Sequence, residues 1–181
     1  MADERDRFER IYREHFGAVL RFALARIDAE RAKDVAAETF LVAWRRLDDV
    51  PAEPRPWLLG VARRVIAGQF RSEARRDALA LRVRAAHEVA DGSADLSGPL
   101  AQRDQVLTAF SMLGERDREA LRLVTWDGLS AAEAAKVLAV TRVAFAVRLH
   151  RARRRLQRAL ESDSSPTPRA QKTRRHADAH P

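Results

Sequence analysis

The sequence contains no cysteine, and this absence excludes several kinds of site at once. Without cysteine the chain has no disulfide framework, no cysteine-ligated zinc and no thiol nucleophile. No uninterrupted apolar run approaches membrane-spanning length, and the first ten residues mix both charges without the apolar stretch of a signal peptide. We therefore expect a soluble, cytoplasmic protein with no membrane segment of its own.

Catalytic motifs are equally scarce. The sequence has no glycine-rich phosphate loop, no His-Glu-x-x-His pair and no Gly-x-Ser-x-Gly elbow. The single tyrosine, Tyr12, lies on the apolar face of an expected helix, so it is a poor nucleophile candidate for a recombinase. His176 and His180 stand four residues apart, but a third ligand does not accompany them. We predict no enzyme activity, no catalytic residue, no metal site and no cofactor.

Acidic residues are in the minority. The 181 residues include 34 Lys and Arg against 26 Asp and Glu, which gives a net charge of +8 and a pI near 11.1. Such a balance indicates a polyanionic partner. The apolar share of 46% is sufficient for the core of one ordinary domain or of two small ones.

The most informative local pattern lies between residues 129 and 160. Ser130 and Glu133 form a capping box, which predicts a short helix that starts at Ala131. Thr141 offers a second N-cap, and a short turn would join the two helices into a helix-turn-helix. The second helix has one apolar stripe at steps of three and four, made of Phe145, Leu149, Ala152, Leu156 and Leu160.

The second helix of this pair is strongly basic. No carboxylate occurs from Thr141 to Leu160, where guanidinium groups are frequent. Guanidinium forks bind phosphate, and a helix fits the major groove of DNA with its first turns against base edges. A solvated basic helix without a ligand is the alternative. The arginines are Arg142, Arg148, Arg151, Arg153, Arg154, Arg155 and Arg158.

Three further helices are expected in the N-terminal half. The first runs from about Arg5 to Arg26, the second covers residues 31–47, and the third begins at Pro54 and Pro56 and continues past Arg76. The second helix has two apolar stripes, which indicates either a partner protein on one side or burial on both sides of its own bundle. One stripe holds Val35, Thr39 and Val42, and the other holds Phe40, Ala43, Trp44 and Leu47.

The third helix has a basic stripe interrupted by a glycine. Gly68 shares this stripe with Arg64, Arg71 and Arg75. A glycine inside a helix is less favourable than alanine by about 1 kcal/mol, so a compensating role is expected. Close approach of a nucleic-acid backbone is one explanation, and simple tolerance of the glycine is the other.

We expect an all-α chain of two small helical domains joined by a flexible linker. Residues 1–88 would form the first domain, 89–100 the linker, 101–161 the second domain and 162–181 a disordered tail. The second domain should hold a helix from Gln105 to Met112 before the helix-turn-helix. Its further core candidates are Leu121, Val124 and Trp126.

Taken in order, these segments resemble the extracytoplasmic-function sigma factors, which are small bacterial transcription initiation factors. AKDVAAETFLVAWRRL resembles the segment of that family that docks on core RNA polymerase. PRPWLLGVARRVIAGQFRSEARR resembles its promoter-melting helix, which reads the minus-ten element. LGERDREALRLVTWDGLSAAEAAKVLAVTRVAFAVRLHRARRRL resembles the module that reads the minus-thirty-five element.

The resemblance implies three sets of site residues. Asp34 and Glu38 match exposed anions of the polymerase-docking motif, and Phe40 and Trp44 match its mainly supporting aromatics. The implied minus-ten set is Arg63, Arg64, Arg71, Arg75 and Arg76. The implied minus-thirty-five set is Arg142, Val143, Val147, Arg148, Arg151 and Arg154. The partners implied are core RNA polymerase and promoter DNA, with an anti-sigma factor as a further candidate.

Several positions depart from the family pattern. Ala37 stands where glutamine is common, Arg64 where asparagine often occurs, and Gly68 where an acidic or polar residue is common. Ala139 occupies a turn position usually held by glycine, and it would be strained at positive φ. These departures mean that a base preference at the minus-ten element cannot be transferred from the family.

The second helix of the helix-turn-helix departs most from the family pattern. At about 100° per residue from Phe145, Val143 and Val147 point outward, where they could contact thymine methyl groups. The alternative is that they pack on a protein, such as an anti-sigma factor.

Three other functions compete with a sigma factor. A helix-turn-helix regulator without polymerase docking would need a sensing domain in residues 1–76, where no alternating strand pattern occurs. A recombinase or nuclease would need a nucleophile or a carboxylate cluster. A sigma-like protein that has lost its activity is the third.

Overall fold

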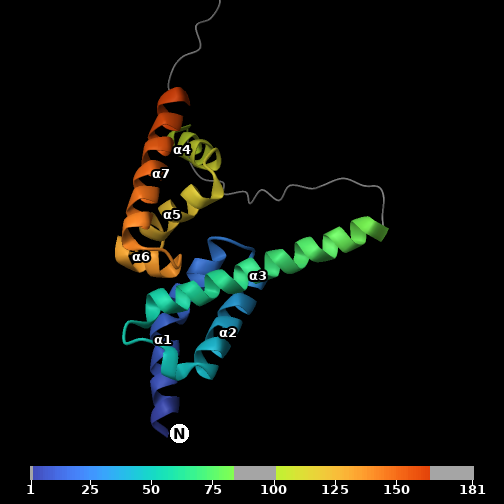
Figure 1. Cartoon of the computed structure of the whole chain (residues 1–181), viewed down its shortest axis with the longest axis vertical. Coiled ribbons are helices and arrows are strands. Elements are labelled where there is room, and N and C mark those ends of the chain that lie inside the picture. Colours follow the sequence, from blue (N-terminus) through green and yellow to red (C-terminus); the bar gives the residue numbers. More distant parts are fainter. Residues whose placement is uncertain (1, 84–100, 164–181) are drawn as a thin grey trace, which may run out of the picture.

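A computed structural model describes residues 2–83 and 101–163, and every regular element in these ranges is a helix. The expected linker and nearly all of the expected tail lie outside the described residues, so the domain boundaries remain predictions. The first three α-helices form one bundle and the last four form another (Figure 1). The elements are α1 (Ala2–Leu24), α2 (Ala29–Arg45), η1 (Leu47–Asp49), α3 (Pro54–Val83), α4 (Ala101–Ser111), α5 (Glu115–Thr125), α6 (Ala131–Val137) and α7 (Arg142–Asp163).

Local capping groups set where these helices begin. The Asp28 side chain accepts a hydrogen bond from the backbone N–H of Arg31 at the start of α2. Ser130 and Glu133 form the predicted capping box of α6. Proline occupies the first turn of α3, where its missing N–H costs nothing. The predicted helices are therefore confirmed, with ends that shift by up to four residues.

The core of the first bundle lies where α1, α2 and α3 meet. Phe22 of α1 is fully buried, as are Val35 of α2 and Leu58 of α3. Thr39 is buried too, and its hydroxyl donates a hydrogen bond to the Val35 carbonyl at 2.7 Å. Since the hydroxyl bonds within its own helix, Thr39 can face the core without an unpaired polar group.

Two aromatic residues of the second apolar stripe of α2 pack against α1. Phe40 is 3% exposed and makes a T-shaped contact with Tyr12, with ring centroids 4.8 Å apart. Trp44 makes a T-shaped contact with Phe8 at 5.1 Å, although 47% of Trp44 remains exposed. Of the two explanations left open for this stripe, burial within the bundle therefore holds for Phe40, because aromatic contacts with α1 cover it.

In the second bundle, the apolar stripe of α7 faces α4 and α5. Phe145 and Ala152 are fully buried, and Leu121 and Leu123 of α5 complete this core. Trp126 was expected in the core, and that prediction is wrong. It is 62% exposed, because it follows the last residue of α5, and its ring centre lies 5.5 Å from that of Phe110.

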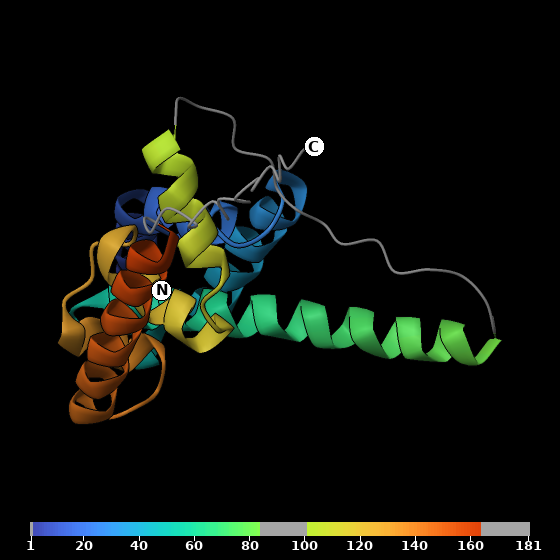
Figure 2. The ribbon, with the colours of Figure 1, turned by 90° about the horizontal axis from the view of Figure 1, so that it is seen from above.

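The α3 helix connects the two bundles and extends beyond them. Its first half packs on α1, α2 and α6, and its second half projects away from both bundles (Figure 2). Gly60 is buried where α3 meets α6, and a Cβ atom there would lie 3.7 Å from the Val137 carbonyl oxygen. Within the described ranges, none of the helices is both long and apolar enough to cross a lipid bilayer.

Candidate nucleic-acid interface

The turn of the helix-turn-helix is built around a strained residue. Ala139 has φ = 52°, so the condition under which strain was expected at this position is met. The Thr141 hydroxyl then accepts a hydrogen bond from the Ala144 N–H at 3.1 Å and caps α7. Together the turn and the cap fix the direction in which the first turns of α7 leave the bundle.

The first turns of α7, which would face the base edges of DNA, expose two apolar side chains to solvent. Val143 is 74% exposed and Val147 is 44% exposed, while Phe145 between them is fully buried. The outward orientation predicted for both valines is confirmed. Their methyl groups cannot make hydrogen bonds to bases, but they can contact a thymine methyl group in the major groove.

The arginines of α7 do not form one uniform surface. Arg148 is half-buried and lines a cleft between the bundles, whereas Arg155 donates a hydrogen bond to the buried carboxylate of Asp117 on α5. The sequence could not distinguish these two from their neighbours. Arg155 is itself 57% exposed despite this contact. The other exposed arginines are Arg142, Arg151, Arg153, Arg154 and Arg158.

A second basic surface lies on α3. Arg64 and Arg71 are exposed, and 43% of the Arg63 side chain is exposed, with its Nε atom 4.0 Å from Oε1 of Glu119. Arg75 and Arg76 belong to the same helix, but their side chains lie outside the described part of the structure. All five predicted minus-ten arginines therefore lie on α3, and the structure describes the side chains of three of them.

An exposed aromatic ring lies next to this basic surface. Phe70 is 48% exposed, and the Arg31 guanidinium of α2 lies 5.9 Å from its ring centre. Trp57, the other aromatic residue of α3, is more buried and lines a shallow hollow with Arg64. A flat ring beside cations is a suitable surface for an unpaired base, because stacking and phosphate attraction act together.

A third surface, on α2, is acidic and partly apolar. Asp34 and Glu38 are exposed, as the sequence predicted. Leu41 is also 41% exposed, and its position three residues after Glu38 places it on the same side of the helix. Sequence reasoning missed Leu41, although the same helical periodicity would have identified it.

Titratable groups at these surfaces stabilise helix starts. The Ser130 hydroxyl and N–H both donate to the Glu133 carboxylate, and these bonds lower the pKa of Glu133. A backbone N–H and the guanidinium of Arg31 likewise lower the pKa of Asp28. Among the described residues, no group of three or more His, Asp or Glu side chains has the arrangement of a metal site.

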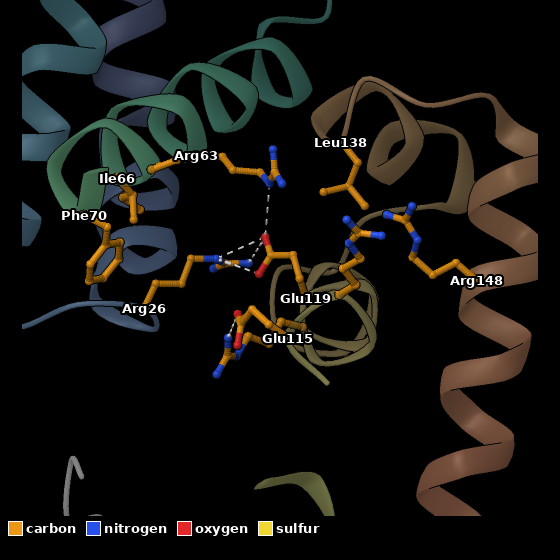
Figure 3. A pocket seen from close by; sticks show the side chains of 11 residues that line it. Arg26, Arg63, Ile66, Phe70, Glu115, Glu119, Leu138 and Arg148 are labelled. Atoms are coloured by element: carbon orange, nitrogen blue, oxygen red, sulfur yellow. Dashed lines mark hydrogen bonds and ion pairs between the residues drawn. The ribbon is translucent and has the colours of Figure 1, made fainter. Parts of the chain in front are cut away.

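The two bundles enclose a cleft of about 400 Å³. Arg26, Arg63 and Glu119 point toward one another in it, as Figure 3 shows, and the dashed lines mark the contacts of both arginines with Glu119. Leu138 and Arg148 border the cleft from the helix-turn-helix side. Sequence reasoning missed Arg26 and Glu119, because 93 residues separate them in the chain.

Comparison with known proteins agrees with this arrangement. Residues 11–76 match the family model Sigma-70 region 2, and residues 103–156 match the model Sigma-70, region 4. A similar solved structure is the sigma factor RpoE from Bartonella quintana, in complex with the anti-sigma factor NepR. Its TM-score is 0.61 at 25% identity, and the match covers 86% of this chain and 98% of RpoE.

Two sigma factors are similar over most of the sequence. The ECF RNA polymerase sigma factor BldN of Streptomyces coelicolor is 30% identical over 168 residues, which are 90% of this chain and 64% of BldN. The chain thus spans just under two thirds of BldN. The ECF RNA polymerase sigma factor SigL of Mycobacterium tuberculosis is 30% identical over 166 residues, which are 83% of this chain and 87% of SigL. The chain belongs to the ECF family of RNA polymerase sigma factors.

Proposed function

We propose that the chain is a transcription initiation factor that binds core RNA polymerase and directs it to promoters with specific minus-ten and minus-thirty-five elements. The observation that supports it most directly is the presence of two exposed basic helix surfaces, on α3 and α7, together with an acidic and apolar surface on α2. DNA binding alone would explain the first two surfaces. The third is what a polymerase contact requires.

The minus-thirty-five element would be read by α7. Arg142, Arg151 and Arg154 are exposed along the helix and suit phosphate oxygens on either side of the groove. Val143 and Val147 would enter the groove and select thymine through its methyl group. Affinity would then come chiefly from the arginines, and sequence choice from the valines and the shape of the groove.

The minus-ten element would bind along α3. Arg63, Arg64 and Arg71 would hold the phosphates, and Phe70 would receive an unpaired base on its exposed ring. Arg75 and Arg76 would extend this phosphate contact along the helix. Opening a duplex costs a few kcal/mol per flipped base, which stacking on Phe70 would partly offset.

Core polymerase would bind through α2. Asp34 and Glu38 would pair with cations of the polymerase, and Leu41 would fill the centre of the contact. Phe40 and Trp44 support this surface from below through their packing on α1. An anti-sigma factor is a further partner in this proposal, because RpoE was solved in complex with one. Function at promoters would place the protein in the cytoplasm.

Charge reversal on α2 tests this proposal. We expect Glu38→Lys to weaken binding to purified core polymerase at least about tenfold, the usual effect of reversing one charge of a close pair. A matched control is Glu14→Lys, which reverses an exposed carboxylate on α1. Equal binding by wild type and both variants, at an affinity unaffected by salt, would contradict the proposed contact. No binding by wild type would favour a regulator that acts without polymerase docking.

A further inference from the structure

The cleft between the two bundles is lined by more cations than anions. Five of its eleven lining residues are arginines, and only two, Glu115 and Glu119, are carboxylates. Its volume of about 400 Å³ lies in the range of about 300–1,000 Å³ that is usual for small-molecule sites. A cleft of this size and charge suits a small, multiply charged anion. The arginines are Arg26, Arg63, Arg116, Arg122 and Arg148.

The two carboxylates of the cleft already have arginine partners. Oε2 of Glu119 lies 3.2 Å from Nε of Arg26, and its Oε1 lies 4.0 Å from Nε of Arg63. Oε1 of Glu115 lies 3.3 Å from Nη1 of Arg122. The charges of these three arginines are therefore offset within the protein.

The other two arginines, Arg116 of α5 and Arg148 of α7, have no such partner. Within the part of the chain that the structure describes, neither guanidinium forms a hydrogen bond or an ion pair. Arg148 is half-buried, and Figure 3 shows its side chain extending from α7 into the cleft. A half-buried guanidinium needs water or an anion to satisfy its donors, so these two groups are the ones available to a ligand.

The α3 side of the cleft is apolar and includes a flat ring. Ile66 and Leu138 are buried, with exposures of 7% and 8%, whereas Phe70 is 48% exposed. In Figure 3, Phe70 and Arg148 lie on opposite sides of the cleft. The face of an aromatic ring can stack on a nucleobase, and guanidinium groups bind phosphate. A nucleotide combines these two chemical features in one molecule.

We propose that the cleft binds a nucleoside polyphosphate, with its base on Phe70 and its phosphate chain at Arg116 and Arg148. The guanidinium forks would each bind two phosphate oxygens, and the stacked base would add to the affinity. Arg63 and Phe70 also belong to the proposed minus-ten surface, so a bound nucleotide would compete with promoter DNA. That consequence rests on the proposed function, but nucleotide binding itself does not.

Isothermal titration calorimetry of the full-length chain, without DNA or polymerase, tests the proposal. The probes are GTP, ATP and inorganic tripolyphosphate. We expect saturable binding of one nucleotide per chain, and at least about fivefold weaker binding of tripolyphosphate, which has no base to stack.

The cationic side is tested by removing one arginine at a time. Arg148→Gln should weaken nucleotide binding at least about tenfold, because it removes charged hydrogen-bond donors. Its matched control is Arg151→Gln, which removes the same charge from an exposed position of α7 outside the cleft and should bind as wild type does. Arg116 is exposed, so Arg116→Gln tests the same side without disturbing the fold and should also lose about tenfold.

The aromatic side is tested by Phe70→Leu. The ring is half exposed, so leucine removes the stacking surface and leaves the core intact. GTP and ATP should bind at least about fivefold more weakly to this variant, while the affinity for tripolyphosphate should stay unchanged.

Three results would overturn the site. The first is no saturable nucleotide binding by the folded wild type. The second is an equal loss in Arg148→Gln and Arg151→Gln, which would mean nonspecific attraction to a basic chain. The third is binding of a short oligothymidylate but of no mononucleotide, with the same dependence on Phe70, because the cleft would then serve DNA alone. Nucleotide binding with the expected losses in a chain that directs no transcription would support the site and contradict the proposed function.

Discussion

Arg155 of α7 donates a hydrogen bond to the carboxylate of Asp117, whose side chain is only 9% exposed at the start of α5. This contact assigns a structural role to one arginine within a row of exposed ones. Arg154, its neighbour in the chain, is exposed. We therefore expect substitution of Arg155 to affect mainly folding stability, and substitution of Arg154 to affect mainly DNA binding.

Substitution of the two arginines should separate these effects. Arg155→Ala leaves a buried carboxylate without its guanidinium partner and should lower the free energy of unfolding by about 1–3 kcal/mol. Arg154→Ala should change it by less than about 0.5 kcal/mol but reduce the salt dependence of promoter binding by about one counterion. Urea unfolding and DNA titrations at several salt concentrations measure both. Identical unfolding curves for the two variants would contradict the structural role of Arg155.

Ala139→Gly should stabilise the protein. A non-glycine residue at φ = 52° costs about 1–2 kcal/mol, while glycine adds about 0.4–1 kcal/mol of entropy to the unfolded chain. The net gain should be about 0.5–1 kcal/mol, measured by urea unfolding. Ala146→Gly, at an exposed position inside α7, is the control and should destabilise by about 1 kcal/mol. A loss of stability in both variants would contradict the strained turn.

Gly68→Ala should raise stability and weaken minus-ten binding. A Cβ atom at residue 68 would meet nothing within 4 Å, so the helix gains about 0.5–1 kcal/mol from alanine without a clash. If a DNA backbone passes close to residue 68, the added methyl group should reduce affinity for single-stranded minus-ten DNA several-fold. Thermal unfolding and fluorescence anisotropy measure the two effects. Higher stability with unchanged DNA affinity would favour simple tolerance of the glycine.

The capping box should make stability depend on pH. Because the pKa of Glu133 is lowered in the folded state, its contribution is fully present above the pKa of the unfolded chain. The contribution is lost as the pH falls through the folded pKa, mostly between about pH 5 and pH 3. Ser130→Ala should lower the free energy of unfolding by about 1 kcal/mol near neutral pH. The difference between wild type and variant should shrink on acidification, and a constant difference would contradict the link to Glu133.

Val147→Ser should change base preference without changing the fold. The side chain is 44% exposed and lies on the reading side of α7, so the substitution removes a methyl contact and leaves the core intact. Selection from a library of minus-thirty-five sequences should show a weaker preference for thymine in at least one position, by about 1 kcal/mol. An unchanged preference at every position would mean that Val147 faces a protein and not DNA.

Helix starts and buried helix faces could be predicted from the sequence where the residues that determine them lie close together in the chain. The Ser130 and Glu133 capping box, the Thr141 cap and the apolar stripe of α7 are set by neighbours within a few residues, and the structure confirms all of them. Strain at Ala139 was expected only if this residue had a positive φ, and the structure gives it φ = 52°.

The features that were missed depend on distant contacts. Arg26 meets Asp127 across 101 residues, and local periodicity carries no information about such a pair. Trp126 follows the last turn of α5, where a helical pattern no longer determines which side is buried. Arg155 differs from Arg154 only by the rotation of one residue around α7, and the position of Asp117 decides which of them is bound.

Run-off transcription with purified core polymerase tests the central claim most directly. The templates are a library of promoter fragments, and each reaction is run with wild type, with Glu38→Lys and without the protein. We predict transcripts from defined start sites that depend on the wild-type chain and are strongly reduced with Glu38→Lys. If a folded wild-type chain gives no transcript while the same core is active with another sigma factor, the assignment as an initiation factor is contradicted.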